Sequence, residues 1–252
     1  MLNSYSFTYI ILYRHSSERL ANLKRVLDWI NGFSGAEVVI VEQDKHSKIS
    51  NLNLKCKHIF TKSDGPFNRS WGFNVGLKYA NSEIIVFADS DLIMMPDDFI
   101  ESLKLMDKYD MVSPYSSVVD LEQNESSSSL EYLSSIRRAG RGEEDNQKIN
   151  ICGGISIFRK DAILNIGGWD QSFIGWGGED DALAIKVKNF LNWYEKQGRC
   201  YHLYHSRVVP DMKYYQKNLQ LLNKIAEMSK DELKRYMSIG VKNMGIKNLN
   251  SI

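Results

Sequence analysis

Two apolar, β-branched runs near the start of the chain enclose one segment of helical periodicity. The first run, FTYIILY, lies within residues 6–13, and the second, EVVIV, spans residues 37–41. Between Leu20 and Ile30, apolar residues recur at the three- and four-residue spacing of an amphipathic helix. Two buried strands joined by a helix form a βαβ unit, in which the strands are parallel and helices cover the sheet. This order predicts an α/β fold.

The same alternation continues through the first half of the chain. A short third strand is expected at residues 58–61, a helix at 68–80 and a buried strand at 83–88, which Asp89 follows directly. Ligands of open α/β sheets bind beyond the carboxyl ends of the strands. We therefore expect the ligand site where three loops meet, at residues 14–17, 42–44 and 89–91.

Leu121–Asn150 differs in composition from the segments around it, because it combines a serine run with the polar tract RGEEDNQK. Few apolar residues are available to anchor it, so we expect a mobile surface loop that includes one short helix. It acts either as a linker or as an active-site lid. Beyond it we expect a strand at ISIF, a glycine-rich segment, a helix from Glu179 to about Phe190, and two helices after Pro210, the last with a Ser229–Glu232 capping box.

Charge, cysteine content and hydropathy narrow the setting. Lys and Arg number 32 against 31 Asp and Glu, so no basic field is available for a nucleic-acid backbone. The three cysteines are far apart without CxxC spacing, which favours a reducing compartment. No stretch approaches the roughly 18 apolar residues of a spanning helix. We expect a cytoplasmic protein, with peripheral contact at the inner face of a membrane left open.

Two motifs offer ligands for a divalent cation. Asp89 and Asp91 are separated by one residue after a buried strand, and on an extended backbone their carboxylates would point to one side and share a ligand. Carboxylate oxygens suit Mg²⁺ or Mn²⁺, and such an ion neutralises a diphosphate. His202 and His205 are three residues apart and can approach one ion from a turn, with imidazole favouring Mn²⁺. The alternatives are a solvated strand end and two satisfied histidines.

The segment FIGWGGEDD is the most informative. Three glycines around Trp176 form a close-approach loop that brings Glu179, Asp180 and Asp181 to the start of a helix. A helix N-terminus stabilises ionised carboxylates, as a catalytic base requires, and acidic residues there also act as plain helix caps. Three acids after an aromatic loop favour a catalytic site.

Several blocks together resemble one family. GGISIFRKDAILNIGGWDQSFIGWGGEDDALA is similar to the catalytic segment of β-1,4-galactosyltransferases and their bacterial relatives, including chondroitin-polymerase-type domains. FNRSWGFNVGLKYA, VFADSDLIMMPDDF and CYHLYHSR resemble further blocks of that family in the same order, and the N-terminal part resembles family 2 glycosyltransferases. The resemblance implies one GT-A (Rossmann-like) domain with a mostly parallel central sheet: a nucleotide-binding half at 1–115, a mobile loop at 116–150, an acceptor and catalytic half at 151–210, and C-terminal helices at 211–252.

The resemblance also implies roles for individual residues. Asp91 and His205 match metal ligands, and Asp89 is oriented toward the ribose or the waters of the ion. His202 falls where the animal enzymes have a ligating methionine, and would be a second, harder ligand. The remaining assignments are Phe67 and Arg69 for uridine and diphosphate, Arg14 and Arg19 in the first nucleotide loop, Glu42 for base or ribose, Trp176, Gly177 and Gly178 at the sugars, Glu179 for the acceptor and Asp180 as general base.

The implied reaction is inverting transfer of a hexose or N-acetylhexosamine, galactose or N-acetylgalactosamine first, from a UDP-sugar. The acceptor would be a glycan or lipid-linked glycan hydroxyl in bacterial surface polysaccharide synthesis. Three alternatives stay open: a retaining enzyme similar to polypeptide N-acetylgalactosaminyltransferases, a hydrolase that uses Asp89 as nucleophile, and a non-catalytic nucleotide-sugar-binding protein. The first has a DxH motif where this chain has DSD, and the second expects its motif after the first strand.

Overall fold

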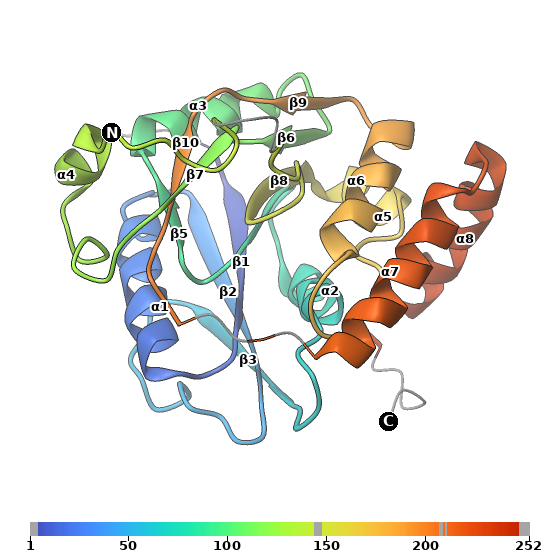
Figure 1. The fold of residues 1–252 in the computed structure, drawn as a ribbon, viewed down its shortest axis with the longest axis horizontal. Helices are drawn as coiled ribbons and strands as arrows, with labels where there is room; N and C mark the ends of the chain where they lie inside the picture. Colours follow the sequence, from blue (N-terminus) through green and yellow to red (C-terminus); the bar gives the residue numbers. More distant parts are fainter. Residues whose placement is uncertain (1–4, 144–147, 207–208, 210, 247–252) are drawn as a thin grey trace.

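A mostly parallel sheet of seven strands forms the centre of the computed structural model, which describes residues 5–143, 148–206, 209 and 211–246 (Figure 1). The strand order is β3-β2-β1-β4-β8-β6-β9. The first four of these strands are mutually parallel, whereas β8 is antiparallel to both of its neighbours. The predicted α/β sheet is confirmed. The strands are β1 Phe7–Tyr13, β2 Ala36–Asp44, β3 Lys57–Lys62, β4 Ile84–Ala88, β6 Met111–Ser113, β8 Ile155–Arg159 and β9 Trp193–Glu195.

The helices expected from periodicity and capping are present. They include the helix that follows the glycine loop and a last helix with both hydrogen bonds of its Ser229–Glu232 capping box. In the described part of the chain, no helix has the length and apolar character needed to cross a membrane. The helices are α1 Ser17–Ile30, α2 Arg69–Tyr79, α3 Pro96–Leu105, α4 Leu130–Ser135, α5 Lys160–Asn165, α6 Glu179–Phe190, α7 Met212–Ala226 and α8 Lys230–Asn243.

Alternation along β1 divides the core into two layers, one on each face of the sheet. Tyr9 and Ile11 face a cluster that includes side chains of α1 and α3, whereas Ile10 and Leu12 face a cluster that includes side chains of α2, α5 and α6. All residues of β1 are buried, which explains its continuous apolar run. In Figure 1, α1 and α2 lie on opposite sides of β1. The helices therefore leave the carboxyl ends of the central strands as the place for a site.

A second, three-stranded sheet was not predicted. Its order is β5-β10-β7, with β5 Leu92–Met94, β10 Arg199–His202 and β7 Ser117–Asp120. The register pairs His202 with Leu92 on one side and with Asp120 on the other. This sheet brings three segments that are distant in sequence together beside the end of β4.

The expectation that few apolar residues anchor Leu121–Asn150 is wrong for its described residues. Leu121, Leu133 and Ile136 are buried in the larger core layer, and Leu133 lies in the short predicted helix, α4. Glu125 forms an ion pair with Arg138. Burial of these side chains supplies the anchoring that the serine-rich composition concealed. Residues 144–147 of the segment lie outside the described residues.

Candidate active site

The two acids of the DSD motif point into different clusters. A turn at Ser90 and Asp91 separates β4 from β5, so the backbone is not extended between the two acids. Asp89 accepts a hydrogen bond from Arg69 Nε at 3.0 Å, whereas Asp91 faces His202 and His205. The expectation that both carboxylates share one ligand is therefore wrong, because same-side projection of residues i and i+2 requires an extended chain.

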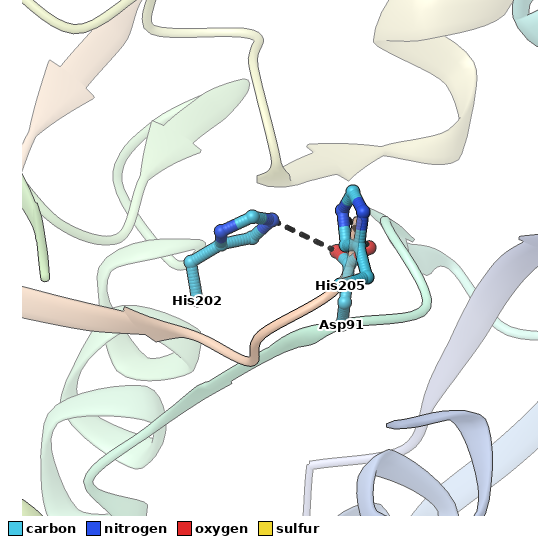
Figure 2. A group of neighbouring side chains, drawn as sticks. All are labelled: Asp91, His202 and His205. Atoms are coloured by element: carbon cyan, nitrogen blue, oxygen red, sulfur yellow. Dashed lines mark ion pairs between the residues drawn. The ribbon is translucent and has the colours of Figure 1, made fainter. Parts of the chain in front are cut away.

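Asp91, His202 and His205 form a compact group of cation ligands. Figure 2 shows both imidazoles beside the Asp91 carboxylate. His205 Nε2 lies 3.2 Å from Asp91 Oδ2, and His202 Nε2 lies 3.8 Å from Asp91 Oδ1. One ligand atom from each residue lies within 4.8 Å of the others. Among the described residues, these are the ones that form such a group, as the spacing of the histidines predicted.

The hydrogen bonds behind the two imidazoles direct Nε2 of each ring toward Asp91. His205 Nδ1 lies 3.0 Å from the carbonyl oxygen of Ser206, which only accepts, so Nδ1 is the protonated atom. His202 Nδ1 lies 3.0 Å from Asp120 Oδ1. Each neutral ring then presents a lone pair on Nε2 to the same point as a carboxylate. This donor set, two imidazoles and one carboxylate, fits a cation such as Mn²⁺.

Electrostatics at this cluster also favour positive charge. Burial by itself would raise the pKa of Asp91, but the hydrogen bond with His205 and the charge of His202 hold that pKa below its ordinary value. The pKa of His205 is raised, chiefly by its hydrogen bond with Asp91. The buried carboxylate therefore requires a positive partner, which is either an imidazolium proton or a cation that displaces it.

The loop that follows β10 is attached to α1 and to the DSD turn. Glu18 accepts hydrogen bonds from the backbone N–H and the hydroxyl of Ser206, at 2.8 and 2.9 Å. Asn22 donates to the carbonyl of Tyr204, and the N–H of Leu203 donates to the carbonyl of Asp91. These contacts position His205, and they are a reason for the polar residues on this face of α1.

Arg69 joins Asp89 to the acids of the glycine loop. Its guanidinium is packed against the rings of Phe73 and Trp169, at 4.7 and 4.9 Å, and forms an ion pair with Asp180 in addition to its bond with Asp89. The three carboxylates around it, which include Glu179, outweigh the effect of burial and raise the pKa of Arg69. Arg69, expected at the diphosphate, thus has carboxylates as its described partners.

Asp180 begins α6 together with Glu179, as predicted, but its electrostatics differ from the prediction. Desolvation by the surrounding protein raises the pKa of Asp180 to about 8, although Arg69 acts in the opposite direction. Burial also raises the pKa of Glu179, which accepts a hydrogen bond from the N–H of Gly177. The expectation that the helix N-terminus decides the ionisation of Asp180 is therefore wrong, because loss of water has the larger effect.

The glycine loop leaves Trp176 at the surface. Gly177 and Gly178 have φ values of 101° and 89°, where residues with a side chain are strained. Trp176 is 62% exposed, and its ring stacks on that of Tyr215 in α7 at 5.5 Å. Asn218 of the same helix donates to the carbonyl of Trp176. An exposed indole supported by a second ring offers a flat apolar face to a ligand.

The candidates in the first nucleotide loop lie at the carboxyl ends of β1 and β2. Arg14 donates to the carbonyls of Gln43 and Gly65, and its guanidinium lies 5.3 Å from the centre of the Phe67 ring. Arg19, in the first turn of α1, is near enough to act electrostatically on Asp91. The structure therefore brings these three candidates to the edge of the sheet that the sequence predicted.

Glu42 has a different environment from the other candidates. It is fully buried, and its carboxylate is bonded to Ser47 Oγ, Lys48 N and His58 Nε2 at 2.6 to 2.9 Å. These partners hold the connection between β2 and β3. Its carboxylate is therefore directed to structural contacts.

Sequence reasoning missed Asp120 and Tyr215. Asp120 ends β7 after two buried valines, so it follows the rule that singled out Asp89, an acid at the end of an apolar run. Its hydrogen bond with His202 is the main cause that lowers its pKa to about 2. Tyr215 lies in an amphipathic helix among other aromatic residues, where no local signal marks it.

Comparison with known proteins agrees with this arrangement. Residues 20–167 match the sequence family described as glycosyl transferase family 2, and residues 143–206 match a family described as N-terminal domain of galactosyltransferase. No curated protein sequence matches the chain.

Solved structures of similar fold include three glycosyltransferases. TarS 1–349 of S. aureus has a TM-score of 0.59 and 14% identity, over 95% of this chain and 71% of that one. GalNAc-T7 with UDP, GalNAc and Mn²⁺ has a TM-score of 0.59 and 13% identity, over 92% and 49%. The catalytic domain of Drosophila β1,4-galactosyltransferase 7 with xylobiose has a TM-score of 0.52 and 15% identity, over 90% and 82%. At these identities, the likeness shows a shared GT-A fold.

Proposed function

The chain belongs to glycosyltransferase family 2, and from this premise we propose that it is a metal-dependent, inverting transferase that uses a UDP-sugar. One observation supports this most strongly. Arg69 bonds to Asp89 of the DSD motif and to Asp180 of the glycine loop, so the strand-end acids and the proposed base belong to one site. A nucleotide-binding protein without catalysis would not require a carboxylate of raised pKa at that position.

We assign the cation to Asp91, His202 and His205, whose ligand atoms converge. When bound, Mn²⁺ or Mg²⁺ would neutralise charge on the diphosphate leaving group. Two imidazoles favour Mn²⁺, because Mg²⁺ prefers oxygen ligands. Arg14, Arg19 and Phe67 lie at the same edge of the sheet, where they would contact the uridine and phosphates.

Asp180 is the proposed general base. It would accept the proton of the acceptor hydroxyl as that oxygen attacks the anomeric carbon, and the product would have inverted configuration. A pKa of about 8 suits this role, because the group gains basicity and is still ionised in part near neutral pH. Glu179 would bind the acceptor, and the exposed face of Trp176 would pack against a sugar ring.

The proposed donor is UDP-galactose or UDP-N-acetylgalactosamine, on the resemblance of the GWGGEDD segment to galactosyltransferases. The proposed acceptor is a glycan or lipid-linked glycan in bacterial polysaccharide synthesis, at the cytoplasmic face of the membrane. Structures of similar fold hold UDP and Mn²⁺ in GalNAc-T7 and xylobiose in the Drosophila enzyme, which is consistent with a sugar nucleotide and a glycan here.

A hydrolysis panel of nucleotide sugars with Mn²⁺ tests the proposal without knowledge of the acceptor. We expect slow release of UDP from one UDP-sugar, and NMR of the later transfer product should show the inverted anomer. If no UDP-sugar is bound or hydrolysed, the chain is not this enzyme. Retained configuration would replace the inverting mechanism by a retaining one.

A further inference from the structure

Asp120 contacts the cation cluster from behind. Its Oδ1 lies 3.0 Å from His202 Nδ1, whereas the opposite ring nitrogen, Nε2, faces Asp91. Asp120 is therefore on the side of the imidazole away from the converging ligand atoms, and it is absent from the described group that could hold an ion. Its position is that of a residue that orients a ligand.

The position of Asp120 is itself determined by two features of the fold. In the parallel pairing of β10 with β7, Asp120 is the register partner of His202. Arg141 then donates to both carboxylate oxygens of Asp120, from Nε at 2.9 Å and from a terminal nitrogen at 3.1 Å. A bidentate pair of this kind restricts rotation of the carboxylate. Asp120 thus has one oxygen directed at the imidazole before any ion binds.

The second histidine is oriented differently. His205 Nδ1 is bonded to the carbonyl of Ser206, a neutral backbone acceptor. A carboxylate behind a ring fixes its tautomer and makes Nε2 more basic, and a carbonyl does so more weakly. The two imidazoles therefore differ, and His202 is the one that depends on a charged side chain from another strand.

We propose that Asp120 is the positioning residue that makes His202 a metal ligand, by holding Nδ1–H and directing the Nε2 lone pair to the site. The proposal rests on the assignment of the cation to Asp91, His202 and His205. It adds a residue to that site that touches neither the ion nor the sugar nucleotide. It also gives the ion-binding face of β10 a dependence on β7.

The effect is measured on Mn²⁺ alone, by electron paramagnetic resonance titration of the full chain. Loss of such an outer carboxylate typically weakens metal affinity about 10- to 100-fold, and we expect this for Asp120→Ala. Asp120→Asn should lose less, because the amide oxygen still accepts from Nδ1. Glu143→Gln is the matched control: it removes another ion pair of this region, with Arg199, and should leave Mn²⁺ affinity unchanged.

A double-mutant cycle separates positioning from general loss of structure. Once His202→Ala has removed the imidazole, adding Asp120→Ala should weaken Mn²⁺ binding no further. In the metal-free protein, ¹⁵N NMR of the histidine ring should show His202 protonated at Nδ1, and this preference should diminish in Asp120→Ala.

Three results would overturn the inference. One is unchanged Mn²⁺ affinity in Asp120→Ala while His202→Ala weakens it. A second is an equal loss from Asp120→Ala with and without His202, which would mean that Asp120 acts on the fold. The third is unchanged affinity in Asp91→Ala, His202→Ala and His205→Ala alike, which would remove the metal site of the proposed function as well.

Discussion

The guanidinium of Arg69 forms an ion pair with the carboxylate of Asp180, although the two residues are 111 positions apart. Through Nε the same guanidinium bonds to Asp89 at 3.0 Å. One buried cation thus joins the end of β4 to the start of α6. Arg69 opposes the effect of burial on Asp180, which without it would be still harder to ionise.

We expect Asp180→Asn to lower turnover by about a hundredfold or more and to leave UDP affinity nearly unchanged, because a general base acts after the donor is bound. Transfer kinetics and calorimetry with UDP and Mn²⁺ measure the two effects. Asp181→Asn is the matched control, since Asp181 is exposed and bonded to Asn150. Transfer by Asp180→Asn at the wild-type rate would exclude Asp180 as the base.

The pH dependence of transfer should report the same carboxylate. The base acts when ionised, and its pKa is raised to about 8, so kcat/KM should rise with pH and level off above about 8. In Asp180→Asn the residual rate should lack this rise. A plateau that begins near pH 5, as expected for an ordinary carboxylate, would contradict the raised pKa.

Binding of UDP should depend on Mn²⁺, since Asp91, His202 and His205 converge on one point. Calorimetry should show weaker UDP binding in EDTA. Asp91→Ala and His205→Ala should reduce the Mn²⁺ response, with His46→Ala as the control because His46 is exposed and outside the cluster. An undiminished response in Asp91→Ala would exclude that residue from the site.

Trp176→Ala should raise the acceptor KM and spare slow donor hydrolysis, because its exposed ring is placed to pack on a sugar. Tyr215→Ala should have a smaller effect in the same direction, since Tyr215 supports the indole from α7. Tyr194→Ala serves as the control, because Tyr194 forms a similar stack with Tyr109 elsewhere. Equal loss of hydrolysis and transfer in Trp176→Ala would contradict an acceptor role.

Hydrogen exchange should distinguish a linker from a lid at residues 121–143. The described part of this segment is anchored by buried side chains such as Leu133, so we expect intermediate exchange without ligand. Protection should increase when UDP, Mn²⁺ and acceptor are bound, because closure over a site orders a lid. Unchanged exchange under saturating ligands would leave the segment a linker.

The sequence by itself determined the elements whose signal is local. The periodicity of residues 20–30, the continuous apolar run of β1, and the Ser229–Glu232 capping box are properties of neighbouring residues, and all three are present in the structure. The same holds for the glycine loop and the acids that begin α6. Such features are readable because helix and strand impose repeats of 3.6 and 2.0 on adjacent positions.

Only the tertiary structure decided how the polar residues are combined. The strands of the β5-β10-β7 sheet are three or four residues long, too short for a periodic signal, yet their pairing puts Asp120 behind His202. A turn of the backbone sent Asp89 to Arg69 and Asp91 to the histidines. Burial then raised the pKa of Asp180 against the helix N-terminus. Contacts and desolvation of this kind depend on residues distant along the chain, so their effects exist only once the chain is folded.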